Sequence, residues 1–188
     1  MRCFVAVDLP DDVRAAVAAA QERWRAASPR ADVAWVEPAK LHLTLEFLGD
    51  VDDDRVPAVC SALDAVVARH PPFTMTTGGA GQFPIQARPR VLWIGLTGGL
   101  REIGLLASDV ERSCMPLGFP LPTRPFRGHV TIGRVRSPRG VARIVSAMHA
   151  ASASFGVWPV GEIVLYRSHL GGAAVSRYEA LARLQLAG

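Results

Sequence analysis

One short pattern occurs twice in the sequence: a histidine, an apolar residue, a threonine and a second apolar residue. The first copy is His-Leu-Thr-Leu at residues 42–45, and the second is His-Val-Thr-Ile at residues 129–132. Alternating polar and apolar residues are typical of a β-strand with one buried face, where residues i and i+2 share a face. Each copy is therefore expected to place one imidazole beside one hydroxyl, with aliphatic side chains buried behind them.

The elements around the two motifs repeat as well. Each half predicts strand, helix, His-Thr strand, helix and strand, and corresponding elements are separated by a nearly constant number of residues. The expected strands are 3–9, 34–36, 41–47, 73–77, 90–96, 126–135, one that follows a turn within 158–166, and 178–184; the expected helices are 10–27, 52–70, 100–117 and 141–151. The glycines at 78–81 and the prolines at 120–125 are expected in irregular segments.

This repetition predicts an internal duplication. We expect one domain over residues 1–188, built from two lobes at roughly 1–88 and 89–188, with room for the terminal strands to be exchanged between lobes. Two such lobes should pack about a pseudo-twofold axis and bring the two His-Thr faces together at a cleft. Since the duplication already supplies both sides of a site, a monomer is expected.

The charge of the chain is uneven. The net charge is +4, and the second half is the more basic one. A run without any acidic residue contains Arg124, Arg127, Arg134, Arg136, Arg139 and Arg143. Such a patch attracts phosphate-bearing ligands, although a solvated surface is the plainer alternative.

The expected cellular compartment rests on three features that the sequence does not show. No apolar run reaches the length of about 18 residues that a membrane helix needs, and Asp8 comes too early for a signal-peptide core. Cys3, Cys60 and Cys114 are widely spaced and form no CxxC pair. We therefore expect a cytoplasmic protein with reduced thiols and no membrane partner.

Three alternatives compete for the two histidines. They could be half-buried structural residues, which the repetition disfavours. They could bind a metal, but a catalytic zinc takes three protein ligands; Glu46 shares the strand parity of His42 and Thr44 and could be a third, whereas no carboxylate follows Thr131 in the second copy. A nucleophilic triad lacks its Gly-x-Ser-x-Gly elbow.

The remaining use of the histidines is direct acid–base chemistry at phosphorus. Imidazole and imidazolium are both accessible near pH 7, so one histidine can take a proton from the attacking oxygen while the other gives one to the leaving oxygen. The threonine hydroxyls can donate to the non-bridging oxygens, where charge accumulates. This scheme needs no metal, and a strained cyclic phosphate suits it.

These residues identify a resemblance. The chain resembles the 2H phosphoesterases, and within them the LigT-like RNA 2′,3′-cyclic phosphodiesterases, also called 2′-5′ RNA ligases. The resemblance rests on the stretches 4–10, 35–38, 41–49, 90–93, 124–132, 164–170 and 178–179. It implies a bilobal α+β fold, with two pseudo-twofold-related lobes of antiparallel sheet and outer helices around a central cleft. It also implies metal-independent hydrolysis of RNA 2′,3′-cyclic ends to 2′-phosphates, possible 2′-5′ ligation, and no cofactor.

The resemblance also implies roles. His42 would be the proton donor and His129 the proton acceptor, a distinction that the sequence itself does not make, and Thr44 and Thr131 would bind the phosphate. Strand parity puts Arg127 on the face of His129, which favours a phosphate contact. One departure is Gly128, where the family often has proline; we expect a change in local stiffness and no lost chemistry.

Further residues are candidates for contact with RNA. The resemblance places His169, with Arg167 and Ser168, near the cleft, and Phe47, Phe83 and Phe126 could stack on a base or belong to the core. The partner would be an RNA with a 2′,3′-cyclic end or a small cyclic nucleotide. The alternatives are an RNA-binding module without turnover and a related enzyme for another cyclic or 2′-5′ nucleotide.

Overall fold

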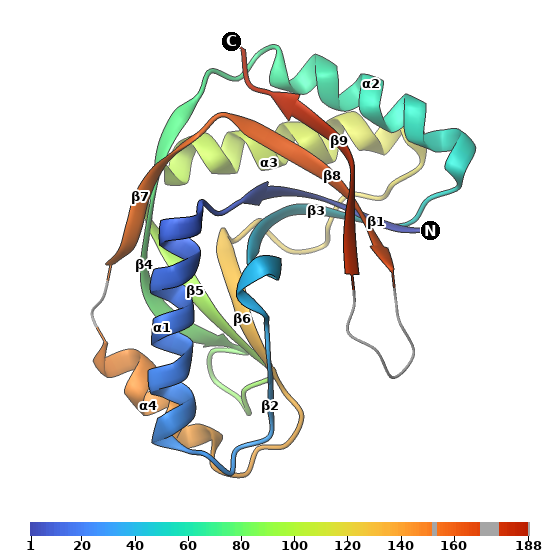
Figure 1. The fold of residues 1–188 in the computed structure, drawn as a ribbon. Coiled ribbons are helices and arrows are strands. Elements are labelled where there is room, and N and C mark those ends of the chain that lie inside the picture. The colour runs from blue at the N-terminus through green and yellow to red at the C-terminus, as the bar shows by residue number, and fades with distance from the viewer. Residues whose placement is uncertain (152–153, 170–176, 188) are drawn as a thin grey trace.

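A strongly curled antiparallel sheet forms the centre of the molecule, and four α-helices lie on its outer side (Figure 1). This computed structural model describes residues 1–151, 154–169 and 177–187. The expected α+β class, with antiparallel sheet and outer helices, is confirmed. In the part of the chain described, no helix is both long and apolar enough to span a membrane.

The elements follow the expected order. The strands are β1 Arg2–Asp8, β2 Val33–Trp35, β3 His42–Asp50, β4 Phe73–Phe83, β5 Val91–Gly98, β6 His129–Val135, β7 Ser154–Val160, β8 Glu162–His169 and β9 Arg177–Gln185. The α-helices are α1 Asp11–Ala27, α2 Val56–Val67, α3 Leu100–Cys114 and α4 Val141–Ala150, and short 3-10 helices cover Pro38–Lys40, Asp53–Arg55 and Met115–Leu117.

The strands are joined in the order β7-β4-β5-β6-β3-β1-β8-β9, and β2 lies beside β6. Strands from the two ends of the chain therefore pair: β1 lies between β3 and β8, while β4 joins β5 and β7. The helices α2 and α3 contact the part of the sheet with β3, β8 and β9, and α1 and α4 contact the part with β4 and β7 (Figure 1). The two parts meet where β3 pairs with β6. An ancestral duplication stays a prediction.

The helices form where an apolar face is available for burial. Helix α1 follows Pro10 and has Asp11 and Asp12 in its first turn, where acids suit the helix dipole. Its buried residues, Val13, Val17, Ala20, Gln21 and Trp24, recur at helical spacing. Four of these five residues are apolar; the exception, Gln21, has a specific role at the site described below.

The expected loop at 78–81 is wrong, because these glycines lie within β4. Gly81 pairs with Trp93 of β5, and a Cβ on Gly81 would stand 2.4 Å from Cζ2 of the indole. The glycine therefore leaves room for the ring to lie across the strand. The glycine that suggested a turn in the sequence is therefore needed inside the sheet, because a side chain on Gly81 would clash with Trp93.

The stretch 158–166 also differs from the expectation of a turn followed by a strand. Residues 158–160 belong to β7, and β8 begins at Glu162. Strand β7 lies at the edge of the sheet, where Pro159 need not donate to a further strand. Leu170, the last residue of the stretch 164–170, lies outside the described residues.

Candidate active site

The two His-Thr motifs lie on neighbouring strands. Strands β3 and β6 are antiparallel and share one paired position, Leu43 with Val130, both fully buried. Counting outward along an antiparallel pair sets His42 opposite Thr131 and Thr44 opposite His129. These four half-buried side chains thus occupy the same face of the sheet, opposite to Leu43 and Val130.

A cleft runs over this face. One part, the His42 cavity, has a volume of about 420 Å³ and is lined by His42, Thr44, Thr131 and Arg134 among others. A second part, the central cavity, has about 500 Å³ and shares both threonines and Arg134 with the first, while His129 also lines it. Both histidines and both threonines therefore border one continuous opening.

The backbone orients both imidazoles in the same way. Nδ1 of His42 lies 2.8 Å from the carbonyl oxygen of Lys40, and Nδ1 of His129 lies 2.7 Å from that of Arg127. Because a carbonyl oxygen only accepts, each Nδ1 carries the hydrogen and each Nε2 is left as the reactive nitrogen. Nε2 of His42 is within 3.1 Å of Oγ1 of Thr44.

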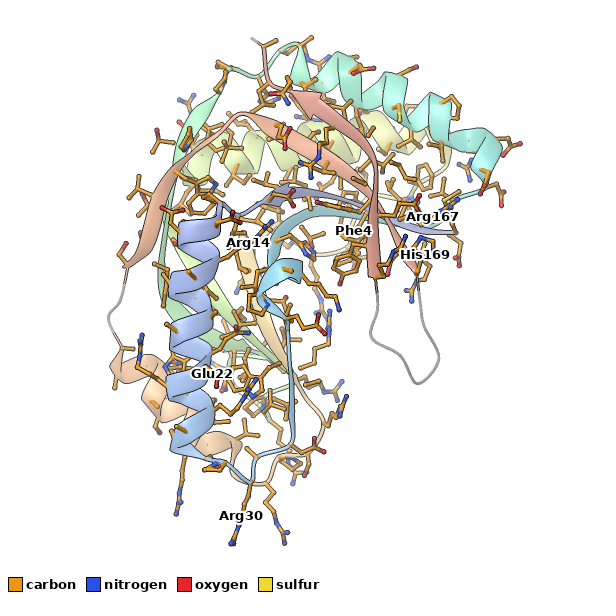
Figure 2. The ribbon with its side chains drawn as sticks, viewed as in Figure 1. Phe4, Arg14, Glu22, Arg30, Arg167 and His169 are labelled. Carbon is orange, nitrogen blue, oxygen red and sulfur yellow. The ribbon has the colours of Figure 1, made fainter. Side chains whose placement is uncertain are left out.

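Aromatic rings restrict the movement of both imidazoles. Phe4 stacks on His42 with ring centroids 4.9 Å apart, on the concave side of the sheet (Figure 2). The ring of Tyr178 meets His42 edge-on at 5.4 Å, and that of Phe83 meets His129 edge-on at 5.1 Å. Such contacts favour one ring orientation without using a ring nitrogen.

The two histidines have different charged neighbours. Burial lowers the pKa of each below the usual 6.5, since it disfavours the charged form. For His42 the carbonyl of Lys40 and the carboxylate of Asp8 oppose this lowering of the pKa, whereas among the described residues no carboxylate raises the pKa of His129. The Arg134 guanidinium lowers the pKa of both.

Asp8 is held firmly beside His42. The two residues pair across β1 and β3, and the hydroxyl of Tyr166 donates to both carboxylate oxygens of Asp8 at 2.8 and 2.9 Å. Arg183 adds an ion pair with Asp8 at 3.2 Å. A fixed negative charge therefore accompanies only one of the two histidines in the described residues, which the sequence pattern did not indicate.

Each His-Thr strand contains an irregularity just after the threonine. The register between β1 and β3 shifts so that Leu45 is skipped, and Glu46 turns to the buried side with 7% exposure. Phe47, 67% exposed, then lines the cleft. The expectation that Glu46 shares the face of His42 and Thr44 is therefore wrong, because the β-bulge reverses the alternation.

The corresponding bulge in β6 has the same effect. The register between β5 and β6 shifts at Ile132, and Arg134 lines both parts of the cleft. The carbonyl of Ile132 accepts from Nε2 of the buried Gln21 at 2.9 Å and from the backbone N–H of Val36 at 3.0 Å. Gln21 therefore stabilises the bulge that directs Arg134 into the cleft.

Burial of Glu46 has a consequence for its protonation. Loss of solvent, with a smaller contribution from Glu111 on α3, raises the pKa of Glu46 from 4.5 to about 7. Within the described residues, no three His, Cys, Asp or Glu side chains are grouped so that they could hold a metal ion. Glu46 and Glu111 do line the central cavity, but Glu46 is not grouped with the two histidines in a way that could hold a metal.

The remaining sequence-based candidates separate into two groups. Arg127 lies beside His129 at the cleft, and Ser168 lines the His42 cavity. Arg167 pairs with Asp53 at 3.2 Å and His169 with Glu179 at 2.6 Å (Figure 2 labels Arg167 and His169). Of the predicted basic patch, Arg124, Arg127 and Arg134 line the cleft or its extension, whereas the cavities described here do not include Arg136, Arg139 and Arg143.

Gly128 has a steric reason for its position before His129. A Cβ on residue 128 would stand 2.6 Å from Cδ1 of Leu96 and 3.5 Å from the ring of Phe126. The Leu96 side chain therefore fills the space that a larger residue would need. Arg134 was predicted only as part of the basic patch and not as a site residue. A further signal was its place five residues after His129, which matches Phe47 after His42.

Comparison with known proteins identifies the class to which this fold and cleft belong. A family model described as LigT like phosphoesterase matches residues 7–93 and again 94–175. An RNA 2′,3′-cyclic phosphodiesterase of Geobacillus stearothermophilus is 35% identical over 98% of this chain, which spans 57% of that relative's length. An RNA 2′,3′-cyclic phosphodiesterase of Methanothermobacter thermautotrophicus is 33% identical over 90% of this chain and 91% of its own.

A solved structure agrees with these matches. The crystal structure of E. coli LigT complexed with 3′-AMP superposes with a TM-score of 0.75 and 30% identity, covering 100% of this chain and 98% of LigT. The chain therefore belongs to the LigT-like phosphoesterase family, as the His-x-Thr motifs predicted.

Proposed function

We propose that this protein hydrolyses 2′,3′-cyclic phosphate ends of RNA to 2′-phosphates by two-histidine acid–base catalysis. The observation that carries the proposal is the matched orientation of His42 and His129. In each, Nδ1 is bound to a carbonyl, which leaves Nε2 as the nitrogen for proton transfer, and Nε2 of His42 lies 3.1 Å from the Thr44 hydroxyl. The relatives named RNA 2′,3′-cyclic phosphodiesterase support the choice of substrate.

The phosphate would lie over the Leu43–Val130 pair. The hydroxyls of Thr44 and Thr131 border the cleft there and would donate to the non-bridging oxygens as their charge grows. Arg127 would add a charge-assisted contact from the side of His129. Phe47 and Arg134 line the same cleft, and the flat surfaces of both could stack on the terminal base.

The proton transfers follow from an in-line displacement. Nε2 of His129 takes a proton from water, and the water oxygen attacks phosphorus. The bond from phosphorus to O3′ breaks, and the imidazolium of His42 gives its proton to O3′. The products are a 2′-phosphate and a free 3′-hydroxyl, and no metal or other reactant is consumed.

The surroundings of the histidines support this assignment of acid and base. The proton donor must be charged before the reaction, and the carboxylate of Asp8 favours the charged form of His42. His129 has the neighbouring Arg134 without such a carboxylate among the described residues, which suits a base that starts neutral. A bound phosphate anion would raise the pKa of both imidazoles and thereby complete the charging of His42.

With a different nucleophile, the same transfers would join RNA ends. A 5′-hydroxyl in place of water would give a 2′-5′ linkage without a cofactor. One chain contains both histidines, so the site would work in a monomer. An RNA-binding module without turnover is the competing function, but binding alone does not require two Nε2 atoms left available in one cleft.

The test is turnover of an RNA with a 2′,3′-cyclic end in excess EDTA. The wild-type protein should release a 2′-phosphate, and His42→Ala and His129→Ala should each lose about 10²–10⁴ in rate. His149→Ala, on the exposed side of α4, is the matched control and should keep the wild-type rate. Circular dichroism would check that all variants fold.

Two results would contradict the proposal. Full turnover in both cleft variants would exclude the two-histidine mechanism, and loss of turnover in EDTA would indicate a metal. RNA binding by a wild-type protein that turns nothing over would instead favour the binding module.

A further inference from the structure

Four exposed arginines form a basic tip at the far end of β6, beyond the cleft: Arg30, Arg136, Arg139 and Arg143. Two segments far apart in the sequence build this tip, one that follows α1 and one that leads into α4. The segments are in contact, because the backbone N–H of Arg136 donates to the carbonyl oxygen of Asp32 at 2.9 Å. Figure 2 shows Arg30 at this end of the molecule, directed away from the sheet. The fold therefore concentrates positive charge that the sequence divides between two places.

The side chains of the basic tip have no charged partner among the described residues. None of the four arginines makes an ion pair there, although arginines elsewhere do, such as Arg112 with Asp109 at 2.6 Å. Asp32 is the only acidic residue in the segments 28–32 and 136–143, and helix α4 contains none. Four guanidinium groups near a single carboxylate leave an excess of positive charge, which attracts phosphate oxygens.

Strand β6 connects the cleft with the basic tip. It begins at His129, passes Thr131 and then reaches Arg134, which lines the His42 cavity. Arg136 lies two residues further on, a separation of about 7 Å in an extended chain. Since Thr131 lies opposite His42, the strand passes the end of the cleft that contains His42 before it reaches the tip. The tip is therefore on the His42 side of the reacting phosphate.

The proposed reaction places the rest of the RNA strand on the same side. His42 gives its proton to O3′, so the ribose with the cyclic phosphate lies at the His42 end of the cleft. The RNA continues from the 5′-oxygen of that ribose, and it leaves the cleft from this end. At the rim formed by β8, Arg167 is already paired with Asp53 and Glu179. The basic tip therefore offers the departing strand more unpaired positive charge than that rim does.

We propose that the basic tip binds the sugar-phosphate backbone of the RNA upstream of its cyclic end, so that the preferred substrate is an oligonucleotide and not a mononucleotide. This rests on the proposed function. The segments 28–32 and 136–143 contain no aromatic residue that could stack on a base. Binding at the tip is therefore expected to be independent of base sequence and to weaken as the salt concentration rises.

The experiment compares 2′,3′-cyclic AMP with an RNA of about ten nucleotides that ends in a 2′,3′-cyclic phosphate. The wild-type protein should have the lower KM for the RNA. Arg136→Ala/Arg139→Ala/Arg143→Ala should raise that KM by about tenfold or more at low salt, while kcat and the hydrolysis of cyclic AMP stay within about twofold of wild type. The slope of log KM for RNA against log salt concentration should fall by about two, because three phosphate contacts are lost.

Two control variants separate a local contact from an effect of overall charge. Arg69→Ala/Arg101→Ala/Arg112→Ala removes the same charge from exposed positions on α3 and just after α2, and it should leave the KM for RNA within about twofold of wild type. Replacing the three tip arginines by lysine keeps the charge and should keep most of the low KM for RNA, since a backbone contact of this kind depends on charge. Circular dichroism would check that all variants fold.

The outcomes separate this inference from the proposed function. Turnover of neither substrate by the wild-type protein would contradict the proposed function. Turnover of both with equal KM values, or a KM for RNA that the alanine variant of the tip leaves unchanged, would overturn the inference alone. An equal rise of this KM in the tip variant and in the α2–α3 control would show an effect of net charge and overturn it. An equal loss of both substrates in the tip variant would indicate damage to the cleft, which also overturns it.

Discussion

The strands β3 and β6 have the same backbone geometry around their His-Thr motifs and differ in the side chains that neighbouring strands place beside them. In both, the imidazole Nδ1 binds the carbonyl two residues earlier, and a bulge follows the threonine. Beside His42 the sheet places the carboxylate of Asp8, whereas His129 has Phe83 at its edge. The repeated pattern thus sets where the reactive nitrogens lie, and the neighbouring strands make them chemically unequal.

The two β-bulges likewise combine the same backbone geometry with different side chains. They turn Phe47 and Arg134 into the cleft from corresponding places, one aromatic and one cationic. On the buried side they place Glu46 in one strand and Gly133 in the other. A single geometry therefore presents different chemistry on its two sides, and this asymmetry can be tested.

The largest effect should come from removing the need for a proton donor. A substrate with sulfur in place of O3′ has a leaving group that departs without protonation, so it should restore most of the lost factor of about 10²–10⁴ to His42→Ala. The His129→Ala variant still lacks its base and should stay slow. Single-turnover rates with the oxygen and sulfur substrates would measure this, and rescue of His129→Ala instead would reverse the two roles.

The next largest effect concerns stability and Glu46. The unfolded chain ionises this carboxyl near pH 4.5, while the folded protein holds its proton up to about pH 7. The free energy of unfolding therefore falls as the pH rises from 4.5 to 7. Above pH 7 it is lower by about 3 kcal/mol than it would be if Glu46 had its usual pKa.

Replacing this carboxyl should remove that deficit. Glu46→Gln should be more stable than wild type at pH 8, and the difference should shrink towards pH 4.5, as measured by urea denaturation. The exposed Glu102→Gln on α3 serves as the control and should show no such pH dependence. A variant that is destabilised equally at both pH values would indicate that Glu46 is ionised in the folded protein.

The smallest effect should come from Asp8. Asp8→Asn removes the charge that raises the pKa of His42, so the protonated donor should be lost at lower pH. The alkaline limb of kcat/KM should move to lower pH, with a fall of about tenfold above neutral pH if the pKa drops by one. The acidic limb, set by His129, should not move. A uniform fall at every pH would mean that Asp8 acts only through the fold.

The sequence predicted the face on which the motifs lie but not the bulges. Alternation placed His42 beside Thr44 correctly, since both precede the irregularity. Beyond Thr44 the same rule placed Glu46 on the wrong face, because one extra residue reverses the alternation, and its position depends on the partner strand. The residues around Glu46 do not include the partner strand β1, so they do not reveal where the bulge lies.

The same limit explains the other differences. Glycines at 78–81 signal a turn locally, yet they lie within β4, where the ring of Trp93 on β5 occupies the space that a side chain on Gly81 would need. Asp8 lies in a strand of its own, and only the pairing of β1 with β3 brings it beside His42. The sequence thus predicted what a strand contains, whereas contacts between distant strands decide how the site is charged.

The pairing of β1 with β8 has a consequence for how the protein is made. Arg2 lies opposite Ser168, so β1 is synthesised well before its partner strand β8. Until then its free edge is open to wrong partners, and contacts this distant in sequence slow folding. Ser168 and Tyr178 also line the His42 cavity. A chain on the ribosome in which β8 and β9 have not yet been synthesised therefore carries His42 without one wall of its cavity.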